Sequence, residues 1–195
     1  VWPYVFSAPF VLAYVTFNLF PTLYSFYISL FEWSGIGPKV YIGIQNYITL
    51  FTKDPLFYKS LYNTLIIMLL AKPAQIICGL LLAQFVFSLQ KGRRFFQTVA
   101  FLPYITAPVA IGFIFSYIFD WQHGYANLIL THMGILKEGI YWTQTPSLAK
   151  LIVALMIIWR LSGYSMIIYI AGMTSIPTEM YEAAKVDGSN AVTTF

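Results

Sequence analysis

Charged residues are what this sequence has least of. Only 9% of its 195 residues are charged, whereas 59% are hydrophobic. Ordinary soluble domains are about one quarter charged. The mean hydropathy of +0.72 points the same way. These values exclude an ordinary soluble domain and indicate a chain that places most of its length in a membrane.

Cysteine and histidine are also scarce. Cys78 is the single cysteine, so a disulfide framework within the chain is excluded. His123 and His132 are far from Cys78 in the sequence and stand in one expected loop. No spacing of these residues is typical of a metal site, so we expect none.

The groups that catalysis needs are missing as well. No glycine-rich loop is followed by a Lys-Ser or Lys-Thr pair, so we do not expect this chain to bind ATP by a P-loop. No Ser/His/Asp arrangement and no pair of carboxylates occurs within the hydrophobic runs. The eleven basic residues form no single patch, which argues against a nucleic-acid partner. We therefore expect neither an enzyme nor a bound cofactor.

What the sequence does contain is long hydrophobic runs. Four of them are expected to span a membrane, at about residues 9–30, 61–89, 98–119 and 148–172. Each is long enough to cross a hydrocarbon core of ~30 Å. The polar connection 32–59 is interpreted as short helices at the membrane surface. The expected fold class is all-α, a polytopic transmembrane helical bundle with four spans present.

The basic residues predict the orientation of these spans. The densest positive turn lies between the second and third spans and contains Lys91, Arg93 and Arg94. The positive-inside rule assigns this turn to the cytoplasm. The first span then runs outward, the second inward, the third outward and the fourth inward. Three tryptophans fall near the expected outer interface, namely Trp33, Trp121 and Trp142.

Two cations lie inside the expected spans. A Lys or Arg at the centre of a membrane helix costs about 2.5–3.5 kcal/mol on insertion scales, so it normally faces protein or water. One reading of Lys72 is that it faces a substrate pathway. The other is that it makes an intramembrane pair or snorkels to the membrane surface, and we favour this other reading. Arg160 either faces the pathway, with Tyr164 one turn later on the same face, or bonds to backbone carbonyls of another helix. Both readings of Arg160 stay open.

The segment 175–195 is the long polar stretch that follows the last hydrophobic run. Pro177 suits a helix start, Glu182 lies early in the helix, and Gly188 suits its left-handed end. The pattern predicts a short helix, a glycine turn and the start of another helix. Its apolar side is shallow, with Met180 and small alanines. Such a helix either plugs a groove of a partner or lies on its own protein.

This segment also resembles a known family. Glu182-Ala183-Ala184 followed by Gly188 is similar to the EAA loop of the membrane subunits of binding-protein-dependent ABC importers. The longer string Ser-Ile-Pro-Thr-Glu-Met-Tyr-Glu-Ala-Ala-Lys-Val-Asp-Gly-Ser, residues 175–189, resembles the sugar-uptake branch of maltose, trehalose and glycerol-phosphate type. Phe101-Leu-Pro103 and Gly112 look like the third helix of that family. Lys72 departs from it, because the family usually has an apolar or small residue there.

The resemblance implies a type I ABC-importer permease, truncated before two further spans beyond Phe195. Its EAA loop would dock in a cleft of a cytoplasmic ATP-binding subunit, which itself uses ATP and Mg. The other implied partners are a second, different permease, an extracytoplasmic solute-binding protein at loop 120–147, and membrane lipid. The implied location is the bacterial or archaeal plasma (inner) membrane. The expected docking residues are Met180, Tyr181, Glu182, Ala183, Ala184, Asp187 and Gly188.

The function implied is half of an ATP-driven translocation pathway for a carbohydrate or related solute. Arg160, Tyr164 and Lys72 are the candidates for lining it. One alternative is an ion-coupled secondary transporter that uses Lys72 and Arg160 as coupling charges. It needs an acidic partner within the membrane, and the hydrophobic runs contain none. The other alternative is a structural membrane subunit without a pathway of its own.

Overall fold

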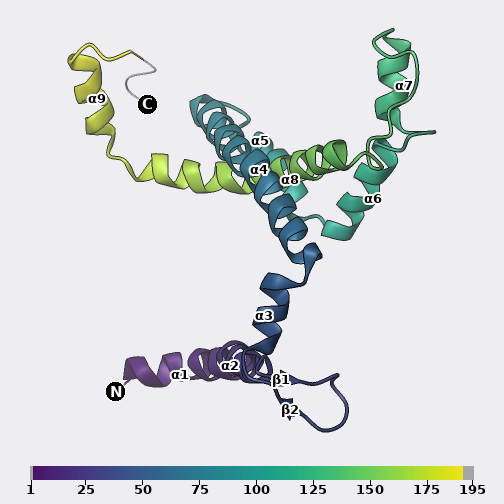
Figure 1. The fold of residues 1–195 in the computed structure, drawn as a ribbon. Coiled ribbons are helices and arrows are strands. Elements are labelled where there is room, and N and C mark those ends of the chain that lie inside the picture. Colours follow the sequence, from purple (N-terminus) through teal and green to yellow (C-terminus); the bar gives the residue numbers. More distant parts are fainter. Residues whose placement is uncertain (1, 191–195) are drawn as a thin grey trace. The chain divides into compact units, whose positions relative to one another are not determined.

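Long apolar runs and the few breaks between them determine the secondary structure. The computed structural model describes residues 2–190, and these are mostly helical (Figure 1). Within residues 2–190, three helices are long and apolar enough to cross a membrane, or up to four spans result if one bent pair is counted as a span. The helical fold class is therefore confirmed. The chain divides into two units, residues 1–62 and residues from 63 onward, and each is described by itself.

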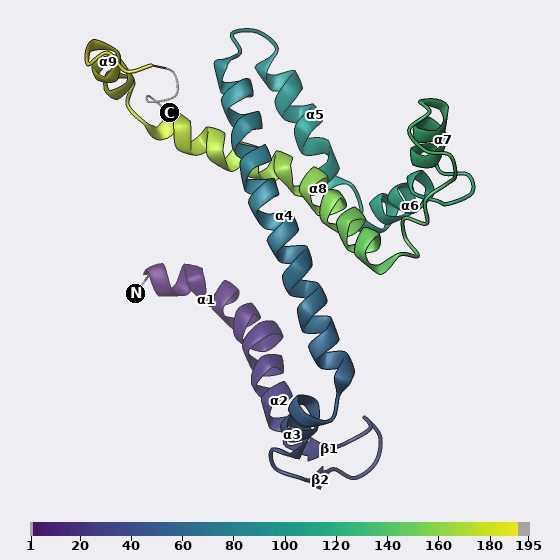
Figure 2. The same cartoon turned by 45° about the horizontal axis from the view of Figure 1, so that its top comes forward.

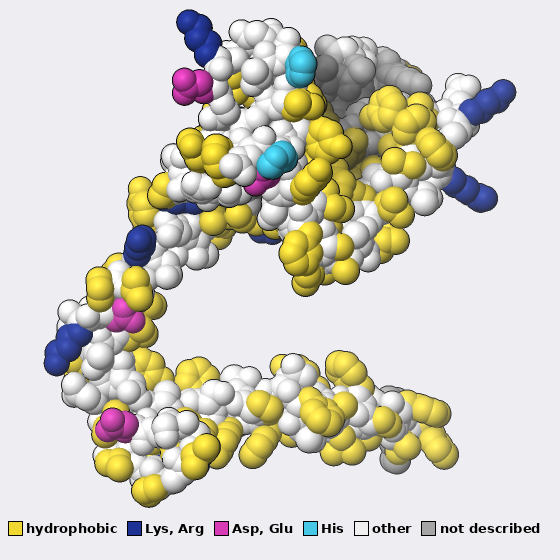
Figure 3. Space-filling view, turned by 90° about the vertical axis from the view of Figure 1, so that its right-hand side faces the viewer, with side chains coloured by type: hydrophobic (Ala, Val, Ile, Leu, Met, Phe, Trp, Pro, Cys, Tyr) yellow, Lys and Arg dark blue, Asp and Glu magenta, His cyan; other side chains and the backbone are white. Residues whose placement is uncertain are grey.

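The first unit begins with one continuous helical segment. It consists of α1 (Trp2–Tyr14), the π-helical turn η1 (Val15–Leu19) and α2 (Phe20–Ile28). The π-helical turn ends two residues before Pro21, which has no N–H to donate to a regular helix. The stretch Tyr4–Ile28 is a candidate span with no buried residue in its hydropathy window. Figure 3 shows hydrophobic side chains along the helical segment from α1 to α2, as expected for a helix surrounded by lipid or by other helices.

The connection after α2 contains a small hairpin that the sequence did not predict. Strands β1 (Phe31–Glu32) and β2 (Val40–Tyr41) pair antiparallel. The short helix α3 (Gln45–Thr52) follows and was expected. Asn46 Nδ2 on α3 donates to the carbonyl oxygens of Ser29 and Phe31, at 2.9 and 3.0 Å. These two bonds fasten α3 to the end of α2 and the start of the hairpin.

The long helix α4 (Pro55–Ser88) begins in the first unit and continues into the second. Asp54 caps it, because its Oδ1 accepts hydrogen bonds from the backbone N–H groups of Leu56 at 2.8 Å and Phe57 at 3.3 Å. With 34 residues, α4 is ~51 Å long at 1.5 Å per residue. It therefore exceeds the ~30 Å hydrocarbon core even though Pro73 lies within it.

The run expected as the third span, 98–119, is two helices rather than one. α5 (Arg93–Ile105) and α6 (Pro108–Ile118) meet at a bend of 93°. Ala107 precedes Pro108 and has extended backbone angles, because a proline disfavours the helical conformation in the residue before it. Thr106 is extended too, and its Oγ1 donates to the carbonyl of Leu102 at 3.0 Å. The pair is a broken span or a re-entrant loop.

The core of the second unit forms where α8 (Pro146–Ser175) meets α4 and α5 (Figures 1 and 2). Met166 and Ile170 of α8 pack with Ala83 and Val86 of α4. Small residues allow close approach of helices in a membrane protein. The clearest case is Gly163 of α8, where an added Cβ would lie 1.8 Å from the carbonyl oxygen of Ala100 on α5.

Two short helices complete the second unit. In the sequence, α7 (Tyr125–His132) comes between α6 and α8. The expected outer loop therefore contains a helix that ends at His132. α9 (Thr178–Val186) follows α8 after only Ile176 and Pro177. The residue ranges predicted for the spans and for the incomplete single domain stay predictions.

Candidate functional site

The helix α9 carries the EAA string, and its predicted glycine turn is present. Gly188 has a φ of +79°, a conformation that glycine adopts without steric cost. The backbone N–H of Ser189 then donates to the carbonyl of Ala184 at 3.0 Å, which closes the helix end. The second helix that the sequence predicted would begin after Gly188 and involves residues 191–195, outside the described residues.

The apolar side of α9 is open. Met180 is 63% exposed and Val186 is 87% exposed. Glu182, Ala183, Asp187 and Gly188 are exposed, whereas Tyr181 and Ala184 are partly buried. The described part of the chain therefore leaves the side chains of Met180 and Val186 uncovered.

Arg160 lies near the middle of α8, among aromatic side chains. Its guanidinium carbon is 5.9 Å from the ring centroid of Tyr104, near the end of α5. The ring of Tyr104 in turn stacks on that of Tyr164, with centroids 4.7 Å apart. The sequence predicted that Arg160 and Tyr164 lie on one face of the helix, and in the structure both contact the ring of Tyr104. The last turn of α5 is also the negative end of its dipole, which favours a cation nearby.

The Nε of Arg160 is buried and has no hydrogen-bond partner among the described residues. One of the two open readings of Arg160 was a hydrogen bond to a backbone carbonyl of another helix. Within the part of the chain that the structure describes, the Nε atom makes no such bond. The sequences of α4, α5, α6 and α8 contain no Asp or Glu, so no carboxylate of these helices offers a counter-charge. A buried donor without a partner is costly, so this position suits a polar group from outside the chain.

Lys72 belongs to a different polar group. Its Nζ donates to Gln75 Oε1 at 3.2 Å, and Gln75 Nε2 donates to Ser165 Oγ at 2.9 Å. Gln75 is only 8% exposed, so this chain of bonds ties α4 to α8 within the core. Lys72 itself is exposed. Its contacts agree with the intramembrane-pair reading better than with a place beside Arg160.

Sequence reasoning missed Tyr104 and Gln75. Tyr104 carried one weak signal, because it is a polar aromatic residue directly after Pro103 in an apolar run. Gln75 lies three residues after Lys72, a spacing that puts both side chains on one helix face. Neither signal indicates which residue of another helix is the partner.

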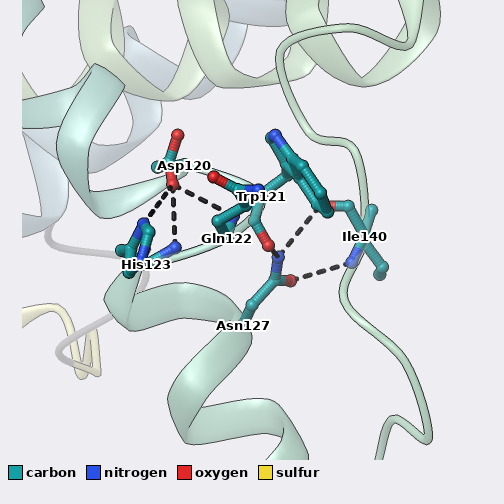
Figure 4. A network of polar contacts seen from close by, with 6 residues as sticks. All are labelled: Asp120, Trp121, Gln122, His123, Asn127 and Ile140. Carbon is teal, nitrogen blue, oxygen red and sulfur yellow. Dashed lines mark hydrogen bonds and ion pairs between the residues drawn. The ribbon is translucent and has the colours of Figure 1, made fainter.

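The loop 120–147, which the sequence predicts to be the outer loop, is held together by Asn127, which is 6% exposed (Figure 4). Its Nδ2 donates to the carbonyls of Trp121 at 3.1 Å and Ile140 at 3.0 Å. Its Oδ1 accepts from the Ile140 N–H at 3.0 Å and from Trp142 Nε1 at 2.8 Å. All the hydrogen-bonding positions of this amide are thus used. The sequence indicated only a polar loop flanked by aromatic residues.

Asp120 forms the tight turn at the start of this loop. Its Oδ1 accepts hydrogen bonds from the backbone N–H groups of His123 at 2.8 Å and Gln122 at 3.0 Å. The bond from His123 is the main cause that lowers the pKa of the Asp120 carboxyl below its ordinary value. No group of three or more His, Cys, Asp or Glu residues that could hold a metal ion occurs among the described residues.

Comparisons with known proteins agree on one family. The family described as binding-protein-dependent transport system inner membrane component matches residues 75–195. The probable ABC transporter permease protein YurN of Bacillus subtilis is 34% identical over 99% of this chain and 66% of its own length. The arabinooligosaccharides transport system permease protein AraP of the same organism is 34% identical over 99% of this chain and 61% of its own. The lactose transport system permease protein LacF of Rhizobium radiobacter is 34% identical over 95% of this chain and 61% of its own length.

Solved structures show the same fold. A bacterial ABC transporter involved in the import of the acidic polysaccharide alginate matches with a TM-score of 0.80 and 24% identity, over 97% of this chain and 63% of that chain. The alginate transporter in complex with its alginate pentasaccharide-bound periplasmic protein matches with a TM-score of 0.79 and 23% identity. The match covers 96% of this chain and 62% of that chain.

The chain spans slightly less than two thirds of the length of these curated relatives. The relatives are named as permease proteins, not as enzymes. The family match covers more than half of the chain and agrees with helices long enough to cross a membrane. The chain is therefore a multi-pass membrane protein that belongs to the family of binding-protein-dependent transport system inner membrane components.

Proposed function

We propose that this chain is the permease subunit of an ATP-driven importer and forms half of its translocation pathway for a carbohydrate or related solute. The family membership supports the importer. The names of AraP and LacF, which specify arabinooligosaccharides and lactose, support the solute class. An ion-coupled secondary transporter fits less well, because the spanning helices offer no acidic residue to carry a coupling ion.

The coupling to ATP is assigned to α9. The observation that carries this proposal is an EAA string on a helix whose apolar side chains Met180 and Val186 are exposed. Two cytoplasmic ATP-binding subunits use ATP and Mg, and a cleft of one of them grips the seven docking residues from Met180 to Gly188 named above. A second permease and an extracytoplasmic solute-binding protein complete the importer. The alginate transporter in complex with its periplasmic protein supports the solute-binding protein.

The short connection between α8 and α9 suits a mechanical link. Only Ile176 and Pro177 separate the two helices, and proline fixes its own φ. Closure of the ATP-bound subunits moves α9, and the connection passes this motion to α8. Because α8 packs closely on α5 at Gly163, the two helices move together and open the pathway outward. Hydrolysis reverses the motion.

A crosslinking experiment tests the docking of α9. In a Cys78→Ser background, Met180→Cys is expected to give a crosslinked product with the co-expressed ATP-binding subunit, and its yield changes with ATP. Met133→Cys is a matched control, because Met133 in the outer loop is 66% exposed and Met180 is 63% exposed. No product from Met180→Cys with well-expressed partners, or an equal product from Met133→Cys, would refute the docking.

The place of Arg160 in the pathway is tested by uptake. Arg160→Met is expected to reduce solute uptake roughly tenfold or more, because a charge-assisted hydrogen bond to the solute is lost. Lys72→Met is expected to change uptake by less than about threefold, because Lys72 bonds within the chain to Gln75. Both are measured with radiolabelled solute at equal membrane expression. Equal losses in the two variants would contradict the separate roles assigned here.

A further inference from the structure

The outer loop contains a pocket that neither the coupling helix nor the Arg160 cluster uses. It has a volume of about 450 Å³ and is open to one side. Its lining residues are Trp121, Gln122, His123, Glu138, Gly139 and Tyr141. The volume lies within the range of roughly 300–1,000 Å³ that is typical of small-molecule sites.

The two walls of this pocket are held in place before any ligand arrives. Asn127 bonds to the carbonyl of Trp121 on one wall and to both backbone groups of Ile140 on the other (Figure 4). Gly139 allows the walls to come close, since a Cβ there would lie 3.1 Å from both Asn127 Nδ2 and the Trp121 carbonyl oxygen. A site that is already formed loses less entropy when it binds a ligand.

The lining has the chemistry that recognises a sugar ring. The rings of Trp121 and Tyr141 stack with centroids 4.9 Å apart and remain 37% and 47% exposed, so they form an aromatic surface beside the opening. The apolar C–H face of a sugar can pack on such a surface. Gln122 offers an amide donor and acceptor, and the Glu138 carboxylate accepts hydrogen bonds from hydroxyl groups.

The charge of the loop restricts the class of sugar. Glu138 lines the pocket and Asp120 lies beside it, with Oδ1 3.9 Å from His123 Nδ1. Lys and Arg are absent from the six lining residues. The Glu138 carboxylate in the lining, with Asp120 beside the pocket, disfavours an anionic ligand relative to a neutral one.

We propose that this pocket is a subsite for a neutral saccharide, which holds one sugar ring at the extracytoplasmic mouth before it enters the membrane pathway. The proposal rests on the proposed function, because it assumes that the importer carries carbohydrate. It adds a site outside the membrane and a preference for uncharged sugars.

The test uses the complete importer, purified with its full-length chain in lipid nanodiscs and without the binding protein. The probe is whichever of lactose, arabinotriose and maltotriose the cells take up through this importer. Binding of the radiolabelled sugar is measured by equilibrium dialysis. Trp121→Ala is expected to weaken binding roughly tenfold through loss of the aromatic surface. The Trp121 carbonyl stays in place, so its bond with Asn127 is kept.

A second variant and a control separate recognition from folding. Glu138→Gln preserves the shape of the lining and is expected to weaken binding roughly fivefold through loss of a charged acceptor. Tyr125→Ala removes a 53% exposed aromatic side chain of the same loop outside the pocket, and is expected to bind like the wild type. Association of the loaded binding protein, measured by surface plasmon resonance, is expected to be equal in all three variants.

Several results would overturn the subsite. Wild-type sugar binding in both Trp121→Ala and Glu138→Gln would do so, as would undetectable binding of the transported sugar to the wild-type complex. Loss of binding-protein association with unchanged sugar binding would assign the pocket to protein docking instead. If cells take up no carbohydrate through this importer, the proposed solute class is overturned and the subsite falls with it, an outcome that differs from loss of the subsite alone.

Discussion

Gly163→Ala is expected to destabilise the protein far more than Gly172→Ala, the other glycine-to-alanine change in α8. The added Cβ would lie 1.8 Å from the Ala100 carbonyl oxygen and 3.0 Å from the Phe101 Cα. These are backbone atoms, so the two helices must separate rather than a side chain turn aside. Overpacking of this kind costs about 1–3 kcal/mol or more. Gly163→Leu is expected to prevent accumulation of folded protein.

The measurement is thermal unfolding of the purified complex in detergent, followed by size-exclusion chromatography of the heated samples. Gly172→Ala is the matched control, because Gly172 lies in the same helix and an added Cβ there meets nothing within 4 Å. Alanine is the better helix former, so this control is expected to be neutral or stabilising by roughly 0.5–1 kcal/mol. Equal melting temperatures for the two variants would show that α5 and α8 do not approach as described.

Changes in the α9 turn are expected to abolish transport while leaving the protein in the membrane. Proline cannot adopt the φ of +79° found at Gly188, so Gly188→Pro must change the turn that ends α9. The bond from the Ser189 N–H to the Ala184 carbonyl is then lost. Glu182→Lys reverses an exposed charge on the same helix, and a surface change like this alters stability by only about 0.5 kcal/mol.

Uptake of radiolabelled solute is expected to fall to the level of cells without the ATP-binding subunit in both variants. Immunoblots of membrane fractions should show unchanged amounts. The controls are Gly188→Asn, since asparagine tolerates a left-handed conformation, and Glu182→Gln, which keeps the shape of the side chain. We expect both controls to retain most of the uptake. Normal uptake in Gly188→Pro and Glu182→Lys at equal expression would remove the coupling role from α9.

The sequence by itself determined the local features of this protein. The membrane character follows from the length of the apolar runs compared with the thickness of a bilayer, and neither depends on contacts between distant residues. The helix α9 follows from Pro177 at its start and Gly188 at its end, which act on the neighbouring backbone only. The family resemblance also lay in one continuous string, so it was visible without a structure.

Only the tertiary structure decided which faces meet. Helices in lipid are apolar on most sides, so the hydrophobic pattern does not mark the face that packs against a neighbour. The contact of Gly163 with Ala100, and the grouping of Arg160 with Tyr104, join residues about 60 positions apart. The sequence predicted one span at 98–119, whereas the structure breaks it by 93° at Thr106 and Ala107, where the backbone leaves the helical conformation before Pro108. The outer pocket exists because Asn127 joins two loop segments, and this choice of partners is long-range.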